Sequence, residues 1–131
     1  MSNKHKGSNA ERELIHLFWS KPNWCAIRVA GSGSMQYPSV DILASNKSRI
    51  LAIECKATRE DSKYIESEQI EQLMTFSEKF GARPVVAIKF LKTEWLFLRP
   101  EELKRVGKNF VIDKETAEKK GIKFKDLIAS Y

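Results

Sequence analysis

Apolar and polar positions follow two different periods along the chain, and the change of period predicts the order of its elements. Leu14, Ile15 and Phe18 recur at helical spacing and predict a helix over residues 10–20. A second apolar stripe predicts a helix over residues 65–80 that stops at Gly81. Short apolar runs predict strands at 24–30, 38–44, 50–56, 84–91 and 94–98. This order predicts an α/β domain with a central mixed five-stranded sheet flanked by helices.

The segments between and beyond these elements are more polar. We expect a flexible basic arm at residues 1–7 and a polar connection at residues 57–64. Residues 100–131 predict a helical extension made of short pieces, such as 113–120 and 123–130. A chain of 131 residues is expected to form one domain, spanning 1–131, around one core.

Composition and charge narrow the functional classes. The net charge of +6 favours an anionic partner, most simply nucleic acid. The longest apolar runs are too short to cross a bilayer, and the first residues lack the apolar stretch of a secretory signal. Cys25 and Cys55 lie in apolar runs and are interpreted as buried thiols of a reducing compartment. We therefore expect a cytoplasmic protein with no membrane partner.

Three charged residues interrupt two of the predicted strands. Asp41 lies in the strand at 38–44, and Glu54 and Lys56 lie two positions apart, on one face of the strand at 50–56. If the strands are neighbours, two carboxylates meet beside one ammonium group. They repel each other unless one of them takes up a proton or a cation such as Mg²⁺ lies between them. A bare E-x-K pattern favours a buried salt bridge of Lys56 with Glu54 or Asp41. The acid on a second strand and the basic chain favour a metal-dependent phosphodiesterase.

Other residues are candidates for the same site. Glu11 shares the inward face of the first helix, where it is either a further metal ligand, direct or through water, or a residue that favours the helix dipole. Arg28 and Ser32 are candidates for phosphate contact, or an ordinary surface arginine and loop serine. Gln69 either reaches the site from the second helix or faces solvent.

The chemistry expected of this set is phosphodiester hydrolysis. A bound divalent cation would neutralise phosphate charge and lower the pKa of a water, with Lys56 orienting or deprotonating that water. His5 and His16 have neither zinc-ligand spacing nor a serine–acid partner, so we expect no zinc site and no serine or cysteine triad. The chain has no phosphate-loop motif, and we expect no nucleotide cofactor.

Several segments, taken in order, resemble archaeal Holliday junction resolvases of the Hjc type. They are residues 6–14, 27–34, 38–41 and 53–56, followed by Glu68-Gln69 and the strand at 85–91. The resemblance implies a restriction-endonuclease-like fold, a homodimer and a Mg²⁺ ion that Mn²⁺ is able to replace. It also implies paired symmetric nicks in four-way junction DNA during homologous recombination and repair. The stretch Met35-Gln36-Tyr37 departs from the lysine-rich loop of some members.

The resemblance also implies roles for individual residues. It makes Glu11, Asp41, Glu54, Lys56 and Ser32 catalytic, with metal bound by Asp41, Glu54 and Glu11. Basic residues are spread along the chain, which suits contacts with the DNA backbone. The DNA-binding set is Lys4, Lys6, Arg12, Arg28, Ser32, Ser34, Arg59, Lys63 and Gln69.

Other interpretations stay open at this point. One is a different restriction- or repair-type DNA endonuclease of the same fold, another is a non-catalytic DNA-binding module, and a weaker one is an RNA-processing endonuclease. The apolar residues near the predicted hairpin either form a dimer interface or belong to the core of one subunit. They are Val85, Val86, Ile88, Trp95 and Phe97.

Overall fold

A six-stranded mixed sheet forms the centre of the molecule. The computed structural model describes residues 3–30 and 36–131, with side chains from residue 9 onward. The sheet has the order β1-β2-β3-β5-β6-β9, and only the β3–β5 pair is parallel. Its strands are β1 (Cys25–Arg28), β2 (Ile42–Ser45), β3 (Ile50–Ala57), β5 (Arg83–Lys89), β6 (Leu96–Leu98) and β9 (Ile122–Lys123). The predicted mixed sheet is confirmed, and β9 adds a sixth strand.

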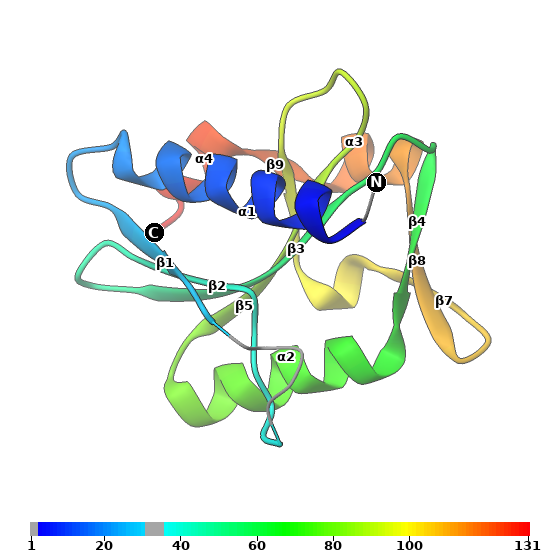
Figure 1. Ribbon diagram of the computed structural model, residues 1–131, viewed down its shortest axis with the longest axis horizontal. Helices are drawn as coiled ribbons and strands as arrows, with labels where there is room; N and C mark the ends of the chain where they lie inside the picture. Colours follow the sequence, from blue (N-terminus) through cyan, green and yellow to red (C-terminus); the bar gives the residue numbers. More distant parts are fainter. Residues whose placement is uncertain (1–2, 31–35) are drawn as a thin grey trace.

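Helices cover both faces of this sheet. Figure 1 shows α1 (Asn3–Trp19) and α4 (Phe124–Ala129) on one side of it and α2 (Ser67–Phe80) on the other. The central strand β3 is buried on both faces because its alternate side chains enter two different cores. Leu51, Ile53 and Cys55 pack with α1, whereas Ala52 packs with α2.

The first helix is longer than the sequence predicts. Its backbone is helical from Asn3, so the predicted start at residue 10 was wrong, and residues 3–7 of the predicted flexible arm belong to the helix. Residues 1–2 lie outside the described part of the chain. The predicted apolar stripe is confirmed, since Leu14 and Phe18 are fully buried and Ile15 packs against the same core.

The second helix starts two residues later than predicted and ends where predicted. Gly81 stops it with a φ of 77°, a left-handed conformation that glycine adopts without a steric penalty. Ile70, Leu73 and Ser77 are buried, as their spacing predicts. Met74 was expected on the same face, but 44% of it is exposed.

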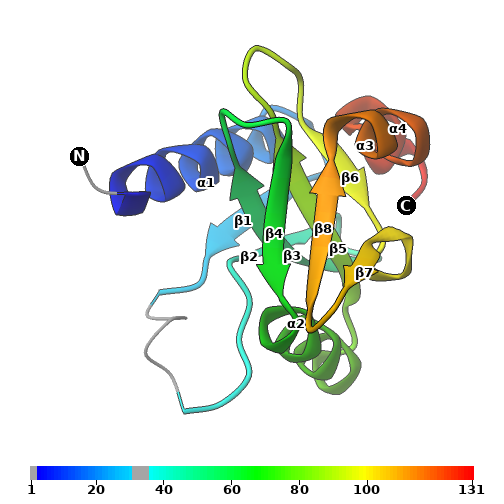
Figure 2. The same cartoon turned by 90° about the vertical axis from the view of Figure 1, so that its right-hand side faces the viewer.

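A second, three-stranded sheet was not predicted. It has the order β4-β8-β7, from β4 (Ser62–Glu66), β8 (Asn109–Asp113) and β7 (Lys104–Val106), and Figure 2 shows its strands side by side. The polar connection at 57–64 and the purely helical extension were therefore wrong in part. The expected helical pieces are present as a 3-10 turn (Pro100–Glu102), α3 (Lys114–Lys120) and α4.

Burial corrects two further expectations. Cys55 is buried, but Cys25 is exposed because it lies on the edge strand β1. The apolar residues considered for a dimer interface belong to the core of one subunit: Val85, Val86, Ile88, Trp95 and Phe97 are each at most 4% exposed. Among the residues that the structure describes, no helix is long and apolar enough to cross a membrane.

Packing of α1 on the sheet should dominate the stability of the fold. Leu14 is fully buried in the core beneath α1, so Leu14→Ala should lower the free energy of unfolding by about 2–5 kcal/mol. The matched control Leu91→Ala, at a position 51% exposed, should change it by less than about 1 kcal/mol. Urea unfolding followed by circular dichroism measures both, and equal losses would contradict this assignment of the core.

Candidate active site

The antiparallel pairing of β2 with β3 brings Asp41 and Glu54 together. Ile42 lies opposite Ile53, so Asp41 and Glu54 face each other one position beyond the paired residues. The Asp41 N–H donates to the Ile53 carbonyl at 3.1 Å, which continues the ladder to this position. The Asp41 carboxylate also accepts from the Cys55 N–H at 2.9 Å, which fixes its orientation. Both acids are therefore held by the backbone of the sheet.

Burial and mutual repulsion disfavour charge on both acids. Glu54 is only 6% exposed, and burial, followed by the nearby Asp41 carboxylate, raises its pKa to about 7. Burial also raises the pKa of Asp41, against the opposing effect of the Cys55 N–H. The part-buried Asp41 and the buried Glu54 therefore form a site where a bound cation would be strongly favoured.

Lys56 is the basic member of the group. Its ammonium lies 3.3 Å from the Glu54 carboxylate, because residues two apart on β3 project from the same face. Its side chain is 18% exposed, so it can be reached from solvent while partly desolvated. The salt bridge considered from the sequence is thus present, and the ammonium offsets part of the charge of the two acids.

Glu11 lies near this group but is paired elsewhere. It comes from the middle of α1, and its carboxylate accepts from the Arg28 Nε at 2.7 Å. The Glu11 side chain is 16% exposed, which agrees with the inward face expected from the sequence. Its negative charge contributes to the raised pKa values of Asp41 and Glu54, so it lies within their electrostatic reach.

The donor set fits a hard divalent cation in part. Asp41 and Glu54 offer adjacent carboxylate oxygens, the ligand type that Mg²⁺ and Mn²⁺ prefer. Across residues 3–30 and 36–131, however, no three His, Cys, Asp or Glu side chains converge as a metal site. Glu11, the expected third ligand, is turned to Arg28 instead.

The predicted DNA-contacting residues are spread around this centre. Arg12 and Arg59 are exposed, and the Arg12 guanidinium donates to the Asn9 side chain at 3.0 Å. Lys63 on β4 and Gln69 on α2 are half-buried. The predicted roles of the Lys4 and Lys6 side chains and of Ser32 and Ser34 lie outside the described residues.

Two contacts near the site were not found from the sequence. One is the Cys55 N–H bond to Asp41, which only the pairing of the strands reveals. The other ties α1 to the sheet: the Glu13 carboxylate accepts from the Lys89 ammonium at 2.6 Å and from the Trp95 indole at 2.8 Å. The sequence showed only an acid two positions after Glu11, on a different side of the helix, and this does not identify a partner on another element.

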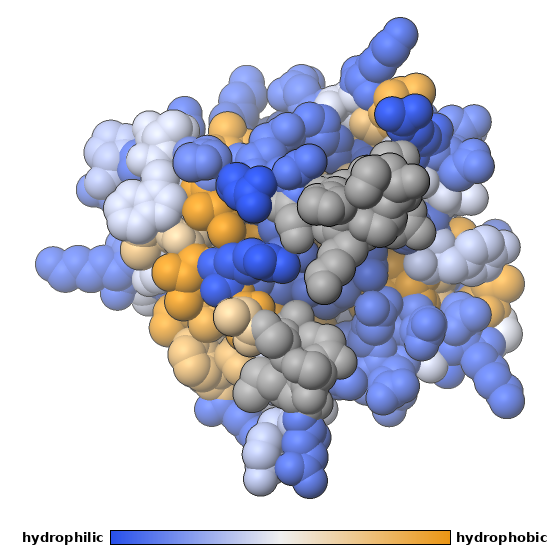
Figure 3. Space-filling view, in the orientation of Figure 1, coloured by the Kyte–Doolittle hydropathy of each residue, from blue (hydrophilic) through white to orange (hydrophobic). Residues whose placement is uncertain are grey.

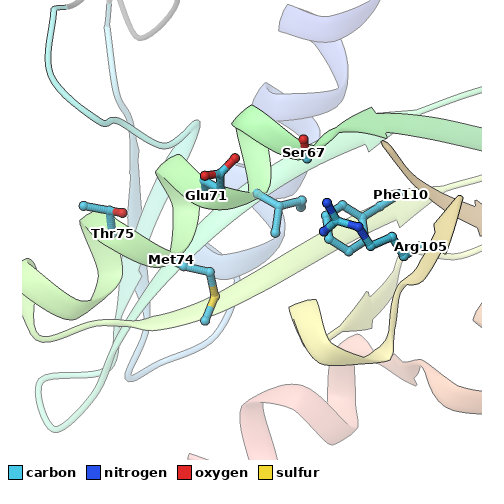
Figure 4. A pocket seen from close by; sticks show the side chains of 7 residues that line it. Ser67, Glu71, Met74, Thr75, Arg105 and Phe110 are labelled. Carbon is cyan, nitrogen blue, oxygen red and sulfur yellow. The ribbon is translucent and has the colours of Figure 1, made fainter. Parts of the chain in front are cut away.

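Two surface pockets lie away from the acids. Figure 4 shows one, of about 440 Å³, between α2 and the β7–β8 hairpin. The other, of about 830 Å³, lies among α1, the β5–β6 turn and β9–α4. Neither is lined by Glu11, Asp41 or Glu54, so the group of acids is not part of either pocket.

The mixed sheet with two acids and a lysine at neighbouring strands defines a restriction-endonuclease-like fold. A solved structure of Archaeoglobus fulgidus Hjc, described as a Holliday junction resolvase from an archaeal hyperthermophile, superimposes with a TM-score of 0.85. The two are 38% identical, and the match covers 92% of this chain and 96% of that one.

Sequence comparison places the chain within that class. The family model described as archaeal Holliday junction resolvase (Hjc) matches residues 2–131. The crossover junction endodeoxyribonuclease Hjc of Archaeoglobus fulgidus is 44% identical over 84% of this chain and 80% of its own length. That of Methanocaldococcus jannaschii is 45% identical over 82% of this chain and 76% of its own length. The chain belongs to the archaeal Holliday junction resolvase (Hjc) family.

The raised pKa of Glu54 predicts how stability changes with pH. In the folded protein this group holds its proton to about pH 7, compared with an ordinary value of 4.5. Between these values the folded state binds more protons than the unfolded state, so the free energy of unfolding falls as the pH rises. In metal-free buffer we expect a loss on the order of 3 kcal/mol across this window, measured by urea unfolding at successive pH values.

The control for this prediction is Glu54→Gln, which removes the titrating group and should flatten the loss of stability. The matched variant Glu66→Gln, on the exposed end of β4, should leave the loss in place. An equally steep loss in Glu54→Gln would show that the raised pKa was assigned to the wrong residue.

Proposed function

We propose that this protein is a structure-selective, Mg²⁺-dependent endonuclease that resolves four-way DNA junctions by paired symmetric nicks. The observation that carries this is the facing pair Asp41 and Glu54 beside Lys56, in a chain that belongs to the archaeal Holliday junction resolvase family. Mn²⁺ is expected to substitute for Mg²⁺. The cytoplasmic location expected from the sequence stays a prediction.

The residues present suit hydrolysis of a phosphodiester. Asp41 and Glu54 would hold the cation, which when bound supplies Lewis acidity and lowers the pKa of a water. Lys56 lies beside them and orients the attacking water toward phosphorus, while its charge offsets the charge on the phosphoryl oxygens. The water oxygen forms the new bond to phosphorus as the bond to the leaving oxygen breaks.

A homodimer supports the proposal, because two opposed strands of a junction must be cut and two-fold symmetry provides two equivalent sites. Figure 3 shows apolar side chains gathered over β1, β2 and the C-terminal end of α2. The exposed or partly buried apolar residues of these three elements include Ile27, Leu43, Phe76 and Phe80, which we call the apolar patch. Ile27 pairs with Leu43 across the strands, Phe76 and Phe80 stack with ring centroids 4.9 Å apart, and Ile27 and Phe80 are at least half exposed. We propose that a second copy of the chain covers this patch.

Replacing Glu54 by glutamine should separate binding from cleavage. Glu54→Gln keeps the size of the side chain and removes its charge, so junction affinity should stay within about threefold, whereas cleavage should fall by at least about 100-fold. Electrophoretic binding assays and end-labelled junction cleavage with Mg²⁺ measure the two effects. The matched control Glu66→Gln should cleave normally, and normal cleavage by Glu54→Gln would refute the assigned role.

The choice of substrate is tested with the unmodified protein. A synthetic four-way junction should be nicked symmetrically in opposed strands, and linear duplex, flap and nicked DNA should be cut far more slowly. Equal rates on linear duplex would favour a different DNA endonuclease of the same fold. Junction binding with no metal-dependent cleavage would favour a non-catalytic DNA-binding module.

Charge placed in the apolar patch should disrupt the dimer. Phe80 is 50% exposed in a single subunit, and Phe80→Glu should lower the mass in solution from twice 15.1 kDa toward one subunit. Light scattering after gel filtration measures this mass. The matched control Leu91→Glu changes a residue 51% exposed in the turn between β5 and β6, and should stay dimeric. Dissociation by both variants, or by neither, would contradict the proposed interface.

A further inference from the structure

The contact between Glu11 and Arg28 keeps one acid out of the site. The Arg28 Nε lies 2.7 Å from the Glu11 carboxylate, and this bond joins the middle of α1 to the last residue of β1. Asp41 and Glu54 remain together without it. Because no three acids converge among the described residues, the arrangement holds two carboxylates of the kind a divalent cation needs and diverts the third.

The two partners differ in how easily they can be reached. The Arg28 side chain is 52% exposed, whereas the Glu11 side chain is 16% exposed. A phosphate arriving from solvent therefore meets the guanidinium first, and arginine binds phosphate through paired, charge-assisted hydrogen bonds. An ion pair with one exposed partner is weak in water, so a phosphate can compete for the arginine.

Glu11 would not remain without a partner after such an exchange. Its carboxylate is mostly buried and already within electrostatic reach of Asp41 and Glu54, whose raised pKa values it contributes to. A third negative charge beside two buried acids is unfavourable unless a cation joins them. The Glu11 carboxylate, once released by Arg28, is thus an additional oxygen ligand next to the two ligands of Asp41 and Glu54.

We propose that Arg28 is a positioning residue that holds Glu11 away from the metal site until a DNA phosphate takes its place. The inference rests on the proposed nuclease function and adds an order of events. In the DNA-free protein a cation is held by Asp41 and Glu54 alone, and Glu11 joins them only when phosphate occupies Arg28. Since coupling between two ligands is reciprocal, metal and DNA then strengthen each other's binding by the same factor.

The first test uses the DNA-free protein and Mn²⁺, with free Mn²⁺ counted by electron paramagnetic resonance. Arg28→Gln should bind Mn²⁺ more tightly than the wild type by about fivefold or more, because Glu11 is released. Glu11→Gln should stay within about twofold of the wild type, since Glu11 is not yet a ligand. The double variant should also lie near the wild type.

The double variant, with both Arg28→Gln and Glu11→Gln, shows whether tighter Mn²⁺ binding comes from release of Glu11 or only from loss of the positive charge of Arg28. If Arg28→Gln strengthens Mn²⁺ binding equally with Glu11 present or replaced, charge alone explains the gain and the proposal fails. Arg99→Gln removes an equally charged side chain, 66% exposed and paired with Glu101 and Glu102 away from the acids, and should leave Mn²⁺ affinity unchanged. Weaker Mn²⁺ binding by Glu11→Gln would also overturn the proposal, because Glu11 would then already be a ligand.

The second test measures the coupling with DNA. Ca²⁺, a hard cation with the same preference for oxygen ligands, should tighten binding of a fluorescent four-way junction to the wild type by about tenfold in anisotropy titrations. Glu11→Gln should lose most of this enhancement, and an undiminished enhancement would refute the exchange. Failure of the proposed function is seen separately, because the wild type would then not cut junctions with Mg²⁺, or would cut linear duplex equally fast, whatever these affinities are.

Discussion

Two carboxylates held face to face, one just before β2 and the other buried within β3, are the constraint on which the rest of this structure depends. The pairing of β2 with β3 places Asp41 opposite Glu54, and a backbone N–H orients the Asp41 carboxylate. Negative charge confined in this way is unfavourable in the empty protein and becomes an advantage when a cation is bound. The repulsion between the two acids lowers the stability of the metal-free protein, but it also means that the metal ligands are in position before the cation binds.

The sheet tolerates this repulsion because its stability comes from the apolar packing and strand pairing of β3. β3 is buried on both faces and pairs along its length with β5, so the strand that carries Glu54 and Lys56 is anchored by apolar contacts on either side. Two charged groups near the end of such a strand cost less than the packing of the rest contributes. β4, the first strand of the separate three-stranded sheet β4-β8-β7, follows β3 along the chain.

Much of the architecture can be predicted from the local pattern of apolar residues. The remainder depends on contacts between segments that are far apart in the sequence. Buried strands such as β3 and β5 show as apolar runs, and charges within such a run mark Asp41, Glu54 and Lys56. β4 was missed because Ile65 is the one buried residue of an otherwise polar stretch, whose partner β8 lies far along the chain. The Glu11–Arg28 contact was missed because it depends on where α1 lies against β1. Sequence periodicity carries no information about that placement.

The attachment of α1 to the sheet limits how the site can change shape. Besides burying Leu14 and Phe18, the helix is tied at its end by the Trp19 indole bond to the Ala26 carbonyl, and in its middle by Glu13. A helix held at these points cannot slide or tilt by much. Any change of partner by Glu11 must then come from rotation about its own side-chain bonds, because the helix that carries it stays in place. The proposed exchange of partners would therefore leave the fold around the site unchanged.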